Sequence, residues 1–190
     1  MHYGALLRGI LAATLMAGAS LDGCLAADQT PIPEPGVKGE KIDSFRGFRF
    51  GETLDKVPKE WELQPASQDA MPDAPLKSYI RNEEVKRLGS IDLQEIVYFF
   101  VNNKFYAVEI MTSDRTQTEM LRLALNHAYG NPSSPSLQED SSVWVGKKVS
   151  AQYCINRNTG EGRALMFDNE LQQSYEKSLN DVAKKAAQGL

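Results

Sequence analysis

The sequence predicts an α+β domain in which an antiparallel sheet, built from meander hairpins, is packed by two long helices and one short helix. Two β-rich runs meet at Asn102-Asn103, and apolar residues recur at helical spacing over residues 114–129 and 168–186. Three further strand-like runs lie between these two helices. The element order suggests two halves, each with one helix followed by three strands.

The domain is expected to begin with a short strand and a short helix. Aromatic residues alternate with Arg and Gly over residues 45–51, which is typical of a strand with one buried face. Thr53 is the expected N-cap of the short helix, and Pro58 limits that helix to a turn or two. Trp61 is expected to fill an edge of the core.

The hairpin over residues 95–112 is the strongest local signal. Asn tolerates the positive φ that a two-residue type I′ turn needs, so Val101 is expected to pair with Lys104 and Phe99 with Tyr106. This register puts one set of residues on one face: Val97, Phe99, Val101, Tyr106, Val108 and Ile110. The other face then carries Ile96, Tyr98, Phe100, Phe105, Ala107, Glu109 and Met111.

Both faces of this hairpin are substantially apolar. The hairpin is therefore either covered on both sides, which we favour, or its second face receives a partner. For that second case, Tyr98, Phe100 and Phe105 are the candidate residues for binding a ligand or partner.

The second half is predicted from a helix, three strands and a closing helix. Asp114 or Thr116 is the expected N-cap of the first of these helices, whose apolar stripe comprises Met120, Leu121, Ala124, Leu125 and Ala128. The strands cover residues 143–145, 149–155 and 163–167, and Cys154 falls on the less apolar face of the middle one. The closing helix should start near Asp168, with a stripe of Leu171, Tyr175, Leu179, Val182 and Ala186.

Residues 1–27 predict a secretion signal. Arg8 is the only formally charged residue before Asp22, and the apolar stretch between them is too short to span a bilayer. The mature protein is therefore expected outside the cytoplasm, either free in the periplasm or anchored in the cell envelope.

Two cleavage sites remain open. The run from Leu21 to Cys24 resembles a lipoprotein signal, in which Cys24 is lipidated and anchors the chain to the membrane. The run from Leu25 to Ala27 instead fits an ordinary cut before Asp28.

Residues 28–44 are rich in Pro and Gly and predict an extended tether, so residues 45–190 form the single folded domain. The net charge of −4 and the mixing of acidic with basic residues argue against nucleic acid as a partner.

The inventory of reactive side chains is short. Because either cut discards or alkylates Cys24, Cys154 is the one ordinary cysteine of the mature chain, and no internal disulfide is expected. Cys154 is interpreted as a small apolar residue of the core. His127 lies near the C-terminal end of the predicted helix over residues 114–129, where the helix dipole favours a histidine. A nucleophilic pair of Cys154 and His127 is the functional alternative.

No residue grouping has metal-ligand spacing, so neither a metal nor a cofactor is expected. Glu83-Glu84 reads as a solvated charged segment.

Residues 51–57 have the G-x-T-x-x-x-V spacing that opens the first helix in small outer-membrane lipoproteins of the β-barrel assembly machinery and in β-lactamase-inhibitor-like domains. The run from Tyr129 to Pro132 is similar to the G-x-P helix stop of such domains, although here it closes the second helix. The resemblance implies a small α+β envelope domain that binds other proteins and has no active site.

These observations leave two classes of function. The favoured one is a non-enzymatic binding or adaptor domain of the cell envelope, for a protein or a small apolar ligand. The alternative is a small periplasmic enzyme that uses Cys154 with His127.

Overall fold

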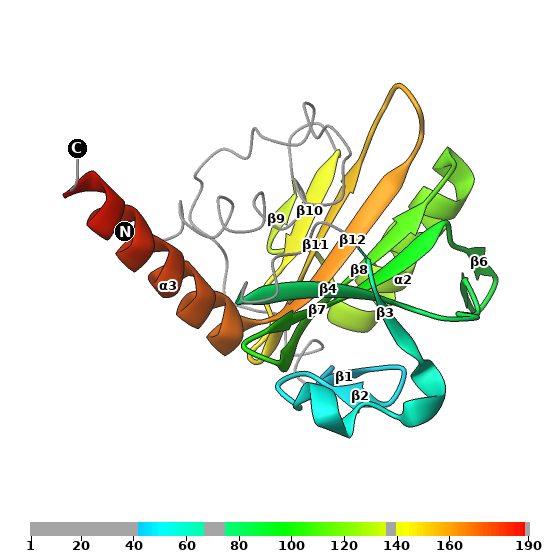
Figure 1. The fold of residues 1–190 in the computed structure, drawn as a ribbon. Coiled ribbons are helices and arrows are strands. Elements are labelled where there is room, and N and C mark those ends of the chain that lie inside the picture. The colour runs from blue at the N-terminus through cyan, green and yellow to red at the C-terminus, as the bar shows by residue number, and fades with distance from the viewer. Residues whose placement is uncertain (1–41, 67–74, 136–139, 189–190) are drawn as a thin grey trace.

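The computed structural model describes residues 42–66, 75–135 and 140–188. One antiparallel sheet forms the centre, with one long helix packed on one face and a second long helix at one end of the other face (Figure 1). The α+β prediction is therefore confirmed at the level of its layers. The expected signal at residues 1–27, the candidate lipidation site Cys24 and residues 28–41 of the tether lie outside the described residues.

The main sheet contains eight strands: β3 (Leu63–Pro65), β4 (Leu76–Arg81), β7 (Glu95–Val101), β8 (Lys104–Thr112), β9 (Ser134–Pro135), β10 (Ser141–Trp144), β11 (Val149–Ile155) and β12 (Gly162–Asp168). Two small hairpins form separate two-stranded sheets: β1 (Ser44–Phe45) with β2 (Phe48–Arg49), and β5 (Arg87–Leu88) with β6 (Ile91–Asp92). The helices are the 3₁₀ turns η2 (Leu54–Lys56) and η3 (Lys59–Trp61) and the α-helices α2 (Arg115–Tyr129) and α3 (Asn169–Ala187).

The strand order is β3-β4-β7-β8-β12-β11-β10-β9. Within the main sheet, the first four strands along the chain pair consecutively (β3, β4, β7 and β8), and so do the last four (β9, β10, β11 and β12). The two sets join where β8 lies beside β12. Helix α2 connects the two sets. Each set therefore has four strands rather than the three expected, because the short edge strands β3 and β9 add to them.

The hairpin of β7 and β8 shows one register correction. Asn102 and Asn103 both have positive φ, and Val101 pairs with Lys104 as predicted. The predicted pair of Phe99 with Tyr106 is wrong, because Phe99 stands opposite Ala107 and the register shifts at this point. The irregularity reverses the faces of the rest of β8, so Val108 and Ile110 join Tyr98, Phe100 and Phe105 in the core beside α2, rather than lying on the opposite face.

The first predicted strand is also corrected. Residues 44–49 form the hairpin of β1 and β2 instead of one strand, because Arg46 and Gly47 both take positive φ and turn the chain back. The start of the domain shifts as well, since Ser44 pairs in β1 and Ile42 packs against the core. Trp61 is buried, as predicted.

Helices α2 and α3 begin at the expected caps. The Asp114 side chain accepts a hydrogen bond from the amide of Gln117, and the Asp168 side chain accepts from the amides of Glu170 and Leu171. The buried residues of α2 are Thr118, Leu121, Leu125 and Tyr129, so the prediction for Ala124 and Ala128, which are exposed, is wrong.

Helix α3 packs on the sheet only through its first half, by way of Leu171, Tyr175 and Leu179. Val182, predicted to lie on its apolar stripe, is 63% exposed, and Ala186 is exposed too. The helix extends beyond the sheet rather than across it (Figure 1).

Candidate functional site

Cys154 and His127 lie on opposite sides of the sheet. Helix α2 packs through Leu121 and Leu125 on the face that carries Tyr153 and Ile155 of β11. Cys154 stands between those two residues in the strand, so its side chain points to the other face. His127 is exposed on α2. The structure therefore does not form the nucleophile and base pair that the sequence left open.

The three aromatic residues proposed for binding are in the core. Tyr98, Phe100 and Phe105 are each 0% exposed and pack together with the aromatic side chains of the β1–β2 hairpin. Their assignment to an exposed binding face is corrected, because the β1–β2 hairpin and η3 cover this end of the sheet. The prediction that the hairpin is covered on both sides is confirmed, since the opposite face is also buried.

Glu84 differs most from its predicted environment. Sequence reasoning placed it in a solvated segment, yet its side chain is 2% exposed. It forms an ion pair with Arg46 in the β1–β2 turn, lies 3.9 Å from Arg81, and accepts a hydrogen bond of 2.8 Å from the Tyr98 hydroxyl. This cluster ties the loop between β4 and β5 to the first hairpin.

A row of five side chains crosses the sheet on the face away from α2. Register pairing places Val97, Glu109, Leu165, Gln152 and Val143 side by side on β7, β8, β12, β11 and β10. We call these five residues the open row, because Leu165, Gln152 and Val143 remain partly exposed. Helix α3 packs at the other end of this face, where Tyr175 lies against Tyr106.

Glu109 is the unusual member of the open row. It is 4% exposed, and its Oε1 accepts a hydrogen bond of 3.3 Å from Arg163 of β12. Its Oε2 is buried and has no hydrogen-bond partner among the residues that the structure describes. Burial raises the pKa of the Glu109 carboxyl, and the Arg163 charge only partly opposes this shift. A buried acceptor left unpaired costs about 1–3 kcal/mol, so this oxygen favours an added donor.

Replacing Glu109 with Gln should change how stability depends on pH. The pKa of the carboxyl is raised above 4.5 on folding, so the folded state binds more protons than the unfolded state between the two values. Stability of the native protein therefore falls as the pH rises through this interval. Relative to the native protein, Glu109→Gln is therefore expected to gain stability as the pH rises above about 4.5. Urea unfolding at a series of pH values measures the free energy of unfolding of both proteins. Glu161→Gln, at an exposed position, is the control. If the free energies of the native protein and Glu109→Gln change in parallel with pH, the prediction is wrong.

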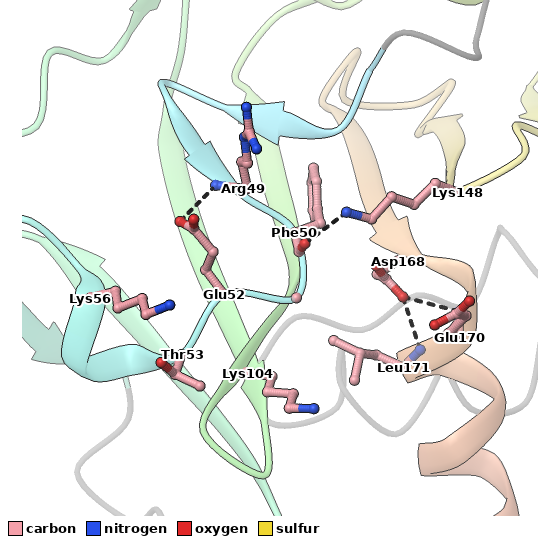
Figure 2. Close-up of a pocket in the computed structure, with 11 residues that line it drawn as sticks. Arg49, Phe50, Glu52, Thr53, Lys56, Lys104, Lys148, Asp168, Glu170 and Leu171 are labelled. Carbon is pink, nitrogen blue, oxygen red and sulfur yellow. Dashed lines mark hydrogen bonds between the residues drawn. The ribbon is translucent and has the colours of Figure 1, made fainter.

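A pocket of about 480 Å³ lies where the first hairpin, the β7–β8 turn and the start of α3 meet (Figure 2). We call it the α3 pocket. Its lining residues are Arg49, Phe50, Gly51, Glu52, Thr53, Lys56, Lys104, Lys148, Asp168, Glu170 and Leu171. Its volume falls within the range of small-molecule sites, but its lining is mostly polar. Sequence reasoning did not identify it, because its charged residues are scattered along the chain.

The local chain geometry builds this pocket. Residues 51–54 pair with the start of β8 through hydrogen bonds from Gly51 to Phe105 and from Leu54 to Asn103. Lys104 thereby stands beside Thr53. Lys148 donates a hydrogen bond of 3.0 Å to the carbonyl oxygen of Phe50, which fixes its ammonium group at the pocket wall (Figure 2).

Among residues 42–66, 75–135 and 140–188, no three His, Cys, Asp or Glu side chains are grouped as metal ligands would be. Within the same ranges no helix is long and apolar enough to cross a membrane.

Comparisons of this chain with protein-family models, with curated proteins and with solved structures found no match. The resemblance of residues 51–57 to the envelope lipoproteins therefore stays a prediction.

Proposed function

We propose that the protein is an exported, non-enzymatic binding domain of the cell envelope that holds a partner protein on its open row. The predicted secretion signal supports the compartment. The observation that supports the binding site is the buried carboxylate of Glu109, which has an unpaired oxygen and lies among partly exposed apolar side chains.

The chemistry of the open row defines its partner. Leu165 and Val143 offer apolar surface, and Gln152 offers an amide for hydrogen bonding. Glu109 Oε2 needs a donor, which a lysine, arginine or asparagine side chain of a partner supplies. The partner segment therefore carries one N–H donor flanked by apolar residues. A buried charged hydrogen bond of this kind gives specificity, because a partner without the donor leaves Glu109 unpaired.

Two finer features belong to the same proposal. The two sets of four consecutively paired strands represent related halves joined at β8 and β12. Such a wide antiparallel sheet with helices at its faces suits the adaptor role implied by the resemblance to assembly-machinery lipoproteins. Either cleavage, before Cys24 or before Asp28, leaves the open row on the exported domain.

The test is site-specific photocrosslinking in a cell that exports the protein. A photoreactive amino acid replaces Gln152 in the open row, and a matched variant carries it at Leu123, which is exposed on α2. We expect a discrete crosslinked product only from position 152, and we expect Glu109→Gln to reduce its yield about tenfold. Intact mass of the same sample shows whether the chain starts at an acylated Cys24 or at Asp28.

Three results would contradict the proposal in whole or in part. Equal crosslinking from positions 152 and 123 would mean that the open row has no special affinity. A mass that retains residues 1–27 in a cytoplasmic fraction would exclude the envelope as the working compartment. A crosslink that Glu109→Gln leaves unchanged would remove Glu109 from the interface.

A further inference from the structure

The second half of α3 presents an apolar stripe that no described residue covers. Every residue from 180 to 187 is exposed, including Val182 at 63%. Val182 and Ala186 continue, at steps of three and four, the stripe by which Leu179 packs on the sheet. Figure 1 shows this half of the helix extending beyond the sheet. Two helical turns without tertiary contacts are marginal in water, so a partner surface would stabilise them.

Lys185 lies beside this stripe. It follows Val182 by three residues and precedes Ala186, so its side chain leaves the helix next to the apolar surface. Lys184 lies on the opposite side of the helix, because it is turned by roughly 200° from Val182 around the axis. Neither lysine forms an ion pair with a residue that the structure describes. The end of α3 therefore offers one N–H donor flanked by apolar side chains.

The open row calls for a segment of this composition. Glu109 Oε2 is buried and has no partner among the described residues, while Leu165 and Val143 are partly exposed. A segment that suits the row carries one N–H donor flanked by apolar residues. Lys185 and Val182 supply this combination on neighbouring positions of the helix surface. The chain therefore carries both sides of one complementary contact.

The two surfaces do not meet within one copy. Helix α3 packs on the sheet through Tyr175 and Leu179, then continues unbroken to Ala187. Lys185 therefore does not reach Glu109 of its own chain unless the helix or its packing breaks. The projecting half is about 12 Å long and the open row crosses five strands, roughly 19 Å, so the helix end fits on the row of a second copy.

We propose that the partner on the open row is a second copy of this chain, which places the second half of its α3 there. Lys185 of one copy donates to Glu109 Oε2 of the other, and Val182 packs against Leu165. A two-fold axis repeats the contact, so each copy supplies one helix end and one row, and the area buried doubles. This dimer rests on the proposed function, because it names the partner that the open row holds.

Sedimentation velocity of the mature full-length protein tests the assembly. We expect the native protein to sediment as a dimer at micromolar concentrations. Lys185→Glu should weaken dimerisation at least tenfold, because it brings two carboxylates together. Lys184→Glu makes the same charge change on the opposite side of the helix and should leave dimerisation unchanged. A native protein that stays monomeric would overturn the dimer, as would equal effects of the two variants.

Crosslinking between isotopically distinct copies tests the contact itself. A photoreactive amino acid replaces Val182 in an equal mixture of unlabelled and heavy-nitrogen-labelled protein, and a matched variant carries it at Val85, which is 69% exposed. We expect crosslinked peptides of mixed label that join α3 to β8, β12 or β11, and only from position 182. Pairs of a single label would mean that α3 contacts its own chain, and equal yields from both positions would mean that the stripe has no preferred contact. Either result would overturn the dimer.

The outcomes separate this dimer from the proposed function. If Gln152 crosslinks to a different protein while the native chain is monomeric, the open row binds a partner and the dimer is wrong. If neither Gln152 nor Val182 gives a discrete product and the chain is monomeric, both proposals are wrong. A product from Gln152 that contains only this chain supports both.

Discussion

Gly162→Ala is expected to destabilise the protein by about 3 kcal/mol or more. Gly162 begins β12 and lies buried opposite Thr112. A Cβ at this position would lie 2.1 Å from Cγ2 and 2.7 Å from Oγ1 of Thr118 in α2. The two elements approach so closely here that no side chain at residue 162 fits without moving the helix. Urea-induced unfolding measures the loss.

Thr118 cannot easily make room for that Cβ. Its hydroxyl lies 2.7 Å from the carbonyl oxygen of Asp114, 2.8 Å from that of Gly160 and 2.6 Å from the Thr112 hydroxyl. A rotation that removes Thr118 from the added methyl group therefore breaks buried hydrogen bonds, which adds to the cost.

Two variants separate this clash from a general effect of replacing glycine. Gly89→Ala has open space around it and a φ of +58°, so it reports backbone strain alone, about 1 kcal/mol. Thr118→Ser added to Gly162→Ala removes Cγ2 and keeps the hydroxyl, so it should recover part of the lost stability. If Gly162→Ala unfolds at the same urea concentration as the native protein, the close approach of β12 to α2 does not restrict the side chain at residue 162.

The fold was predictable where a local turn signal or a regular alternation of apolar residues in the sequence matches the structure. Asn102 and Asn103 specify their turn locally, and β11 alternates cleanly between buried and partly exposed residues around Tyr153 and Cys154. The irregularity at Tyr106 and Ala107 was not predictable, since both faces of that hairpin are apolar and a slip by one residue leaves the pattern unchanged. The edge strands β3 and β9 are too short to show any period.

The candidate sites were less predictable, because each depends on residues that only the fold brings together. Glu109 left a usable signal, since a single carboxylate among apolar residues of a strand predicts a buried charge with a partner. The α3 pocket left none, because Lys56, Lys104 and Lys148 come from separate elements and each is an ordinary surface residue in the sequence. The burial of Glu84 was not predicted, because the sequence analysis treated Glu83 and Glu84 together as one solvated segment, and only Glu83 is exposed.

Glu84→Gln is expected to cost about 3 kcal/mol, as for other buried ion pairs that lose one partner. The Glu84 carboxylate balances Arg46, whose guanidinium also donates to the carbonyl oxygens of Val85 at 2.7 Å and Arg87 at 2.9 Å. Those carbonyl bonds hold Arg46 in place when the carboxylate is gone. An amide of the same shape therefore leaves a partly buried positive charge without its counter-charge.

The loss should be local as well as global, because the cluster joins two segments distant in sequence. Arg46 lies in the turn between β1 and β2, and Glu84 lies 38 residues further along the chain. Hydrogen exchange should therefore increase first in the β1–β2 hairpin, whose aromatic residues cover Tyr98 and Phe105. Urea unfolding gives the free energy, and Glu83→Gln, the exposed neighbour, is the matched control. Equal stabilities of the two variants would show that Glu84 acts only as a surface charge, despite a side chain that is 2% exposed.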